Sequence, residues 1–306
     1  MLRFLATRIV QSLVILLGVT VITFVLSFLV PADPVRMIAG RSATPATVAS
    51  IRHQLGLDQP LPVQYARYVG NLARGDMGRS YVQKSEVSTL IASRLPATLL
   101  LMAGAIFFEI AIGLPAGLFA ATRRGRLSDR VVMVMSFAGI SAPQFVIGLL
   151  LLYLLAYLLG WFPLGGYGTV WHLVLPALTL GITGGGWYSR MTRSSMVDVL
   201  RQDYIRTARA KGMGERRVVL IHGLRNAIVP VVAMIGLDIG IFMSGAVVVE
   251  SVYGWPGIGQ LAWQAIQRID IPIIMGVTLV AAVAIVIGNL LADIATSLID
   301  PRVRLG

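Results

Sequence analysis

Two carboxylates lie in stretches of the sequence that are otherwise free of charge. Glu109 is the one charged residue of residues 95–121, and Asp238 is the one charged residue of residues 227–249. A lone carboxylate in hydrocarbon costs about 2.5–3.5 kcal/mol on insertion scales, so we expect each to face protein or a water-filled path. Two roles stay open. The pair can line a translocation path and meet a cationic ligand group, or each carboxyl can pair with another subunit or stay protonated.

Other residue types that perform catalysis or bind metals are scarce. The chain has no cysteine, which excludes disulfides and thiolate metal sites, and its three histidines, His53, His172 and His222, are scattered. The nucleotide-binding pattern GxxxxGK[ST] is absent, so the chain should not hydrolyse ATP itself. The sequence therefore predicts a non-catalytic protein without a metal site.

The densest group of charged residues is a basic segment, residues 190–225. Two sets of apolar residues recur there at helical spacing, first Val197, Leu200, Tyr204 and Ala208, then Val218, Ile221, Leu224 and Ile228. Gly212 and Gly214 interrupt the pattern, which predicts two short helices joined at a glycine break. The positive charges can simply set membrane topology or contact anionic headgroups. The alternative is a docking surface for a cytoplasmic partner.

The elements that position these residues are membrane spans. The chain of 306 residues is 56% hydrophobic and 13% charged, about half the charged fraction of a soluble domain. Six apolar stretches are long enough to cross a bilayer, which requires about 20 residues. They predict an all-α, polytopic membrane protein with six transmembrane helices. These stretches are residues 9–30, 95–121, two within 131–189 that are separated by a turn at 160–167, 227–249 and 273–298.

The arrangement of basic residues predicts the topology. Residues 123–130 and 190–225 hold half of all Lys and Arg, which places both segments and both termini in the cytoplasm. Three regions follow: residues 1–30 with the first span, an external segment 31–94, and a five-span core, residues 95–306, that contains the cytoplasmic loop 190–226. We expect the protein in the plasma (inner) membrane.

At the basic segment the sequence resembles a known family. RTARAKG (206–212) and HGLRNAIVP (222–230) are similar to the cytoplasmic loop in membrane subunits of peptide-type ABC importers. Arg-Thr stands where the general importer loop has Glu-Ala, a departure typical of the dipeptide, oligopeptide, glutathione and nickel branch. The resemblance covers essentially the whole chain. Its other motifs are PADPVR (31–36), LGLDQPLPVQY (55–65), RGDMGRS (74–80), VVESVYGWPGIGQL (248–261) and IDPRVR (299–304).

The resemblance implies a type I ABC importer permease fold and a role in transport. It implies a heterodimer with a similar permease, two cytoplasmic ATPases that bind ATP and Mg, and an external substrate-binding protein; this chain would bind no cofactor. It also implies that residues 203–212, here named the coupling loop, dock in a cleft of the ATPase. The implied contact residues are Asp203, Tyr204, Arg206, Thr207, Ala208, Arg209, Ala210, Lys211 and Gly212.

Two rival functions and the ligand stay open at this point. A stand-alone, ion-coupled secondary transporter is the alternative, although such a protein would not need the basic loop for coupling. A membrane-embedded enzyme is a weaker rival, because the sequence contains no visible nucleophile–base pair. Dipeptides, oligopeptides, glutathione and nickel chelates are all compatible with the resemblance.

Overall fold

The computed structural model describes residues 2–29, 35, 43–54 and 56–299, and the regular structure in this part of the chain is helical. The predicted all-α class is therefore confirmed. PADPVR, apart from Val35, and nearly all of IDPRVR lie outside the described residues. The elements, of which η1 and η2 are π-helical, are α1 (Leu2–Leu29), α3 (Pro45–Gln54), α4 (Leu61–Ala73), α5 (Val87–Thr122), α6 (Leu127–Ser141), α7 (Gln144–Leu151), η1 (Leu152–Leu158), α8 (Val170–Val199), α9 (Asp203–Ala210), α10 (Glu215–Arg217), η2 (Val218–Gly223), α11 (Leu224–Ala227), α12 (Val229–Met243), α13 (Val247–Tyr253), α14 (Ile258–Gln267) and α15 (Ile271–Ile299).

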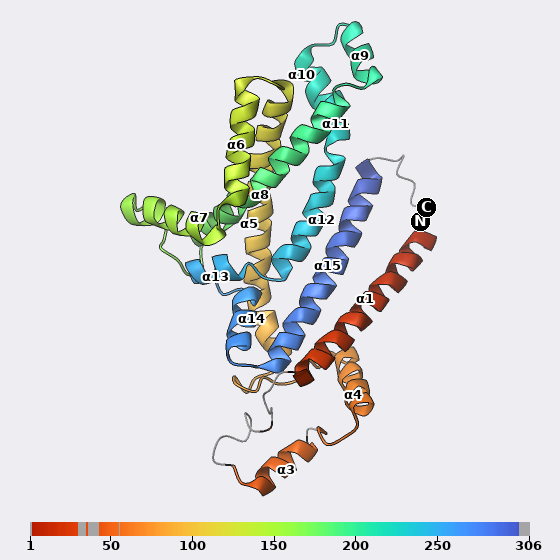
Figure 1. The fold of residues 1–306 in the computed structure, drawn as a ribbon, viewed down its shortest axis with the longest axis vertical. Helices are drawn as coiled ribbons and strands as arrows, with labels where there is room; N and C mark the ends of the chain where they lie inside the picture. The colour runs from red at the N-terminus through yellow and green to blue at the C-terminus, as the bar shows by residue number, and fades with distance from the viewer. Residues whose placement is uncertain (1, 30–34, 36–42, 55, 300–306) are drawn as a thin grey trace.

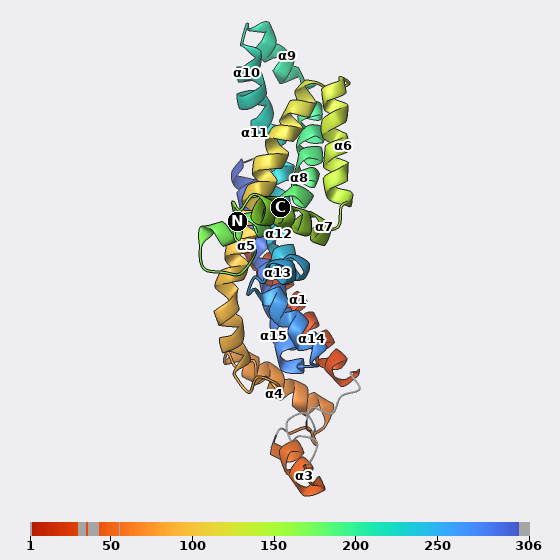
Figure 2. The ribbon, with the colours of Figure 1, turned by 90° about the vertical axis from the view of Figure 1, so that its left-hand side faces the viewer.

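Four long helices, α5, α8, α12 and α15, form an elongated bundle (Figure 1). Helices α9 and α10 lie at one end of its long axis, and α3 and α4 lie at the opposite end (Figure 2). Small residues let α5 and α8 pack backbone to backbone. A Cβ atom on Gly113 would overlap Tyr188, and one on Gly117 would overlap Ser189 and Thr192. Such close approach through glycine is typical of helix pairs inside membranes.

The first and last long helices lie side by side. Helix α1 is largely apolar and exposed, as a helix surrounded by lipid would be, and it packs along α15 (Figure 1). Near the start of α1, Arg8 forms an ion pair with Asp293 at 2.6 Å, close to the end of α15. The beginning of the first span and the end of the last span therefore lie at the same side of the bundle.

Length and composition identify some of the six spans that the sequence predicts. Among the described residues, three helices are long and apolar enough to cross a membrane, namely α1, α5 and α15. Two further candidates are bent pairs: α6 with the segment α7–η1, at 101°, and residues 215–227 with α12, at 46°. Pro143 and Pro230 follow these breaks and cannot donate a backbone hydrogen bond to the preceding turn. Helix α8 is not among these candidates, so the count of six stays a prediction.

The connection before α15 is helical over much of its length. It contains α13 and α14, and between them Trp255 is buried and donates from Nε1 to the carbonyl oxygen of Ala97 at 2.9 Å. Asp270 then accepts hydrogen bonds from Ser80 Oγ at 2.5 Å and from the backbone N–H of Val82 at 3.1 Å. This buried carboxylate fastens the segment before α5 to the start of α15.

Candidate functional site

Helix α9 presents most of its surface to solvent at the end of the bundle (Figure 1). Ile205 and Ala208 are its two buried residues, and they pack against Val218 of η2. The other residues of α9, and Lys211 directly after it, are exposed to solvent. They are Asp203, Tyr204, Arg206, Thr207, Arg209, Ala210 and Lys211. All of the predicted contact residues thus lie on α9 or directly after it, and Ala208 is the one whose side chain faces inward.

Gly212 ends α9 in the left-handed conformation that the sequence break predicts. Its φ is +74°, and its backbone N–H donates to the carbonyl oxygen of Arg209 at 2.9 Å. The next N–H, that of Met213, donates to the carbonyl oxygen of Ala208 at 3.3 Å. These two bonds form a Schellman motif, which usually requires glycine at this position. A Cβ atom here would meet no atom within 4 Å, so backbone conformation rather than crowding requires the glycine.

Three contacts that the sequence did not reveal hold α9 in place. Arg209 donates from Nη2 and Nε to the two carboxylate oxygens of Glu215, at 2.6 and 3.0 Å, across the glycine turn. Asn226 Nδ2 donates to the Tyr204 hydroxyl at 2.9 Å. Ile205 supplies the apolar contact. The bidentate pair has a weak signal in the sequence, since an arginine and a glutamate flank the glycine break.

The helical faces inferred from the basic segment are partly wrong. Val197, Leu200, Tyr204 and Ala208 do not share one helix, because the chain breaks at residues 200–202 and Tyr204 is 43% exposed. In the second set, Ile221 is 54% exposed whereas Val218 is buried. The π-helical winding of η2 explains this difference, because each turn contains about one additional residue and shifts the buried face.

The two carboxylates of the apolar stretches come together in the bundle. Glu109 on α5 is 3% exposed and lies against Gly184 of α8, where a Cβ atom would overlap its carboxyl group. Asp238 on α12 accepts a hydrogen bond from the hydroxyl of Tyr188 on α8. Glu109 lies close enough to Asp238 for the two carboxyl groups to interact electrostatically, and within the described part of the chain Glu109 Oε2 has no hydrogen-bond partner. Glu109 is thus shielded by this chain, whereas Asp238 is half-buried, and Tyr188 is a partner that the sequence did not reveal.

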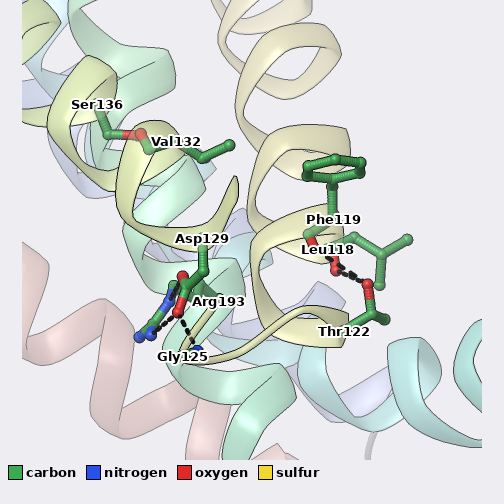
Figure 3. A network of polar contacts seen from close by, with 8 residues as sticks. All are labelled: Leu118, Phe119, Thr122, Gly125, Asp129, Val132, Ser136 and Arg193. Carbon is green, nitrogen blue, oxygen red and sulfur yellow. Dashed lines mark hydrogen bonds and ion pairs between the residues drawn. The ribbon is translucent and has the colours of Figure 1, made fainter. Parts of the chain in front are cut away.

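Another buried carboxylate lies where the basic turn after α5 begins α6. Asp129 accepts hydrogen bonds from Arg193 Nε and Nη2, at 2.5 and 2.7 Å, and from the backbone N–H of Gly125 at 2.9 Å (Figure 3). Arg193 comes from α8, so the contact joins two elements that are 64 residues apart. Sequence reasoning missed this pair, because periodicity does not indicate which arginine of a basic cluster meets an acid.

A third buried acid explains the glycines of VVESVYGWPGIGQL. Glu250 on α13 is fully buried and accepts a hydrogen bond from the backbone N–H of Gln260 at 2.6 Å. A Cβ atom on Gly257 or Gly259 would overlap or crowd its carboxyl group. These two glycines of the motif therefore make room for the acid of the same motif.

In the described part of the chain, no group of three or more His, Asp or Glu residues could hold a metal ion.

Comparisons with protein families match nearly the whole chain. Residues 113–305 match the family described as binding-protein-dependent transport system inner membrane component. Residues 1–102 match the N-terminal membrane component of the same kind of transport system.

Individual relatives agree with this match. The glutathione transport system permease protein GsiC of Salmonella paratyphi A is 42% identical over 304 residues, which are 99% of each chain. The oligopeptide transport system permease protein AppB of Bacillus subtilis is 41% identical over 315 residues, covering 99% of this chain and all of the relative.

Solved structures agree with the fold. An inward-facing structure of the MetNI methionine ABC transporter has a chain that superposes with a TM-score of 0.58 at 19% identity. The match covers 69% of this chain and 96% of that one.

Proposed function

The chain belongs to the family of inner membrane components of binding-protein-dependent transport systems, and from this premise we propose that its coupling loop docks onto the ATPase. The protein is a permease subunit of an ATP-driven importer in the inner membrane, and a separate ATPase and a substrate-binding protein are its partners. ATP hydrolysis is the task of the partner, so this subunit is not an enzyme. The rival functions, a secondary transporter and a membrane-embedded enzyme, find no support in these relatives.

The single observation that supports the docking proposal is the construction of α9. A helix of eight residues exposes all but two of its side chains, yet it is held near both ends. The hydrogen bond from Asn226 to Tyr204 holds its first turn, and the Schellman motif around Gly212 ends it. A polar helix held this rigidly can transmit force to the spans, whereas a flexible loop could not. A segment that only set topology would need charge but no fixed geometry.

The proposal also includes the subunits of the complex and the topology of this chain. We infer a heterodimer with a similar permease, two ATPases, and cytoplasmic placement of both termini and of residues 190–226. Helix α9 and the helices of the segment 31–94 lie at opposite ends of the bundle, which agrees with opposite sides of a membrane. The division into residues 1–30, 31–94 and 95–306 follows the same logic. The names of the relatives, glutathione and oligopeptide permeases, favour a small peptide as the transported solute.

Glu109 and Asp238 remain a proposal as residues of the translocation path. Their position among α5, α8 and α12, three helices of the bundle, supports it. Their proximity to each other supports the other role, in which one carboxyl stays protonated within the protein, because two adjacent ionised carboxylates would repel each other.

Two glycines that are two residues apart provide a matched test of docking. Gly212 has φ of +74°, whereas Gly214 has φ of −61°, and neither would bring a Cβ atom within 4 Å of another atom. Gly212→Val should strain the turn by about 1–3 kcal/mol and misplace α9, while Gly214→Val should be tolerated. We expect normal membrane abundance for both variants. Only Gly212→Val should lose ATPase co-purification and uptake of a labelled peptide mixture that includes glutathione.

The control separates docking from topology. Neither substitution changes a charge, so a segment that only sets orientation predicts that both variants transport normally. Wild-type uptake and ATPase recovery in Gly212→Val would refute docking through this loop.

A further inference from the structure

The coupling loop is continuous in sequence with only part of the bundle. Residues 200–202 join it to α8, and α10, η2 and α11 join it to α12. Movement of α9 therefore reaches α8 and α12 through the backbone. The hairpin of α5 and α6 has no such direct connection, because α7, η1 and residues 159–169 separate α6 from α8 along the chain, so its direct links to the moving helices are side-chain contacts.

The two arms of this hairpin contact the neighbouring elements differently. The end of α5 meets α8, η2 and α11 in an apolar cluster that contains Ala121, Met196, Val219 and Ala227. Apolar contacts of this kind are not directional and permit small sliding movements. Helix α6 instead meets α8 at this end through Asp129 and Arg193. A bidentate bond between a guanidinium and a carboxylate fixes orientation as well as distance.

The carboxylate of Asp129 is buried and surrounded by hydrogen-bond donors. The side chain of Asp129 is 4% exposed and that of Arg193 is 27% exposed. Gly125, at φ +81°, turns the chain so that its N–H also points at the carboxylate (Figure 3). One acid thus receives three donors, two from α8 and one from the α5–α6 turn.

At the turn between α5 and α6, Asp129 is the one acidic side chain that can pair with Arg193. The other charged residues from position 123 to 130 are basic and exposed, namely Arg123, Arg124, Arg126 and Arg130. Asp129 is the one acid among them. Without it, Arg193 would face a cluster of like charge and would be repelled from the turn.

We propose that the Asp129–Arg193 ion pair transmits movement of the coupling loop to the α5–α6 hairpin. Both are positioning residues: they keep α6 fixed to α8 while the loop moves with the ATPase. The inference rests on the proposed docking of α9, and it adds the route by which α6, and the bent segment α7–η1 beyond it, follow that movement.

Spin labels can measure this link without a known ligand. The chain has no cysteine, so Arg124→Cys on the turn and Arg201→Cys at the end of α8 give unique label sites in this subunit. Both positions are exposed. The distance between the labels is measured in the complete importer, with the other subunits free of cysteine, in the absence of nucleotide and after trapping with ATP and vanadate. We expect one narrow distance distribution in both states, because the two labels move together.

Breaking the pair should separate the two movements. In Asp129→Asn the distribution should widen or shift in the trapped state, and peptide uptake should fall roughly 2- to 30-fold, the range for residues that carry coupling. Asp129→Glu keeps the charge and should restore most of both. Arg123→Gln is the matched control, since Arg123 lies in the same turn but stacks on Phe119 of α5, the helix that it ends.

The result that would contradict this inference differs from the result that would contradict the docking proposal. An unchanged trapped-state distribution in Asp129→Asn, or equal widening in Arg123→Gln, would overturn the inference. So would an Asp129→Glu variant as uncoupled as Asp129→Asn, because charge would then be irrelevant. ATPase co-purification should stay normal in all of these variants. Docking itself fails only if Gly212→Val keeps its ATPase and its uptake.

Discussion

Two carboxylate clusters of this molecule, one at Asp129 and one at Glu109 with Asp238, differ in how their buried negative charge is stabilised. Asp129 lies next to the basic turn and is neutralised by the guanidinium of Arg193 and by a backbone N–H. Glu109 lies between the long helices next to Asp238, and Asp238 in turn accepts a hydrogen bond from Tyr188. The first cluster keeps its charge and balances it. We expect the second to reduce its charge by holding a proton, because two adjacent buried carboxylates repel each other.

This difference follows from where each cluster lies along the helices. Near the helix ends a long arginine side chain can reach both water and an acid, so an ion pair is formed at little cost of desolvation. Deep in an apolar bundle the second ionised group would itself have to be buried, and a proton is the smaller compensation. The clusters should therefore respond differently when a charge is removed and when an amide replaces the acid.

The largest expected effect comes from removing the arginine. Arg193→Met preserves an unbranched apolar stem but leaves the carboxylate of Asp129 buried without its charged donor. Losing charged hydrogen bonds to a group that stays buried should lower the free energy of unfolding by about 3 kcal/mol. The thermal midpoint of the purified complex measures this. Arg190→Met, on the same helix, removes only a stacking contact and should shift the midpoint far less.

A smaller effect is expected from crowding the second cluster. Gly184→Ala would place a methyl group on the carboxyl of Glu109, which must then leave Asp238. Overpacking of this kind costs about 1–3 kcal/mol. Gly18→Ala is the matched control, because a Cβ atom on that helical glycine meets nothing within 4 Å. If contact with Glu109 is the cause, the double variant with Glu109→Ala should recover much of the loss; full additivity of the two changes would contradict the contact.

The same contrast shows what the sequence could predict. The apolar stretches indicate a helical membrane protein, and the glycine break indicates the end of α9, because both depend on local pattern. Glu109 and Asp238 were also visible, since a charge stands out in an apolar stretch. Their partners were not visible. Tyr188, Arg193 and Ile205 have their roles only because elements distant in sequence meet in space.

The bends of the helices were also beyond the sequence pattern. The π-helical turn of η2 moves the buried face by part of a turn, so counting by 3.6 residues assigned Ile221 to the wrong side. The break between α6 and α7 lies inside a stretch without any charge, where hydropathy alone shows no boundary.

The smallest effect should come from replacing the acid that we expect to hold a proton. Glu109→Gln preserves shape and removes the repulsion between two adjacent carboxyl groups, so the free energy of unfolding should change by less than about 1 kcal/mol. Asp129→Asn should cost more than this, because an amide cannot replace a carboxylate that accepts three donors. Thermal unfolding of both variants in one preparation makes the comparison direct. A larger loss for Glu109→Gln than for Asp129→Asn would show that Glu109 is ionised and would reverse the assignment. Uptake of a lysine-containing and a neutral tripeptide by the same Glu109→Gln complex then tests the path. A defect confined to the cationic peptide would place the cluster on the path, and equal uptake of both would assign it to packing alone.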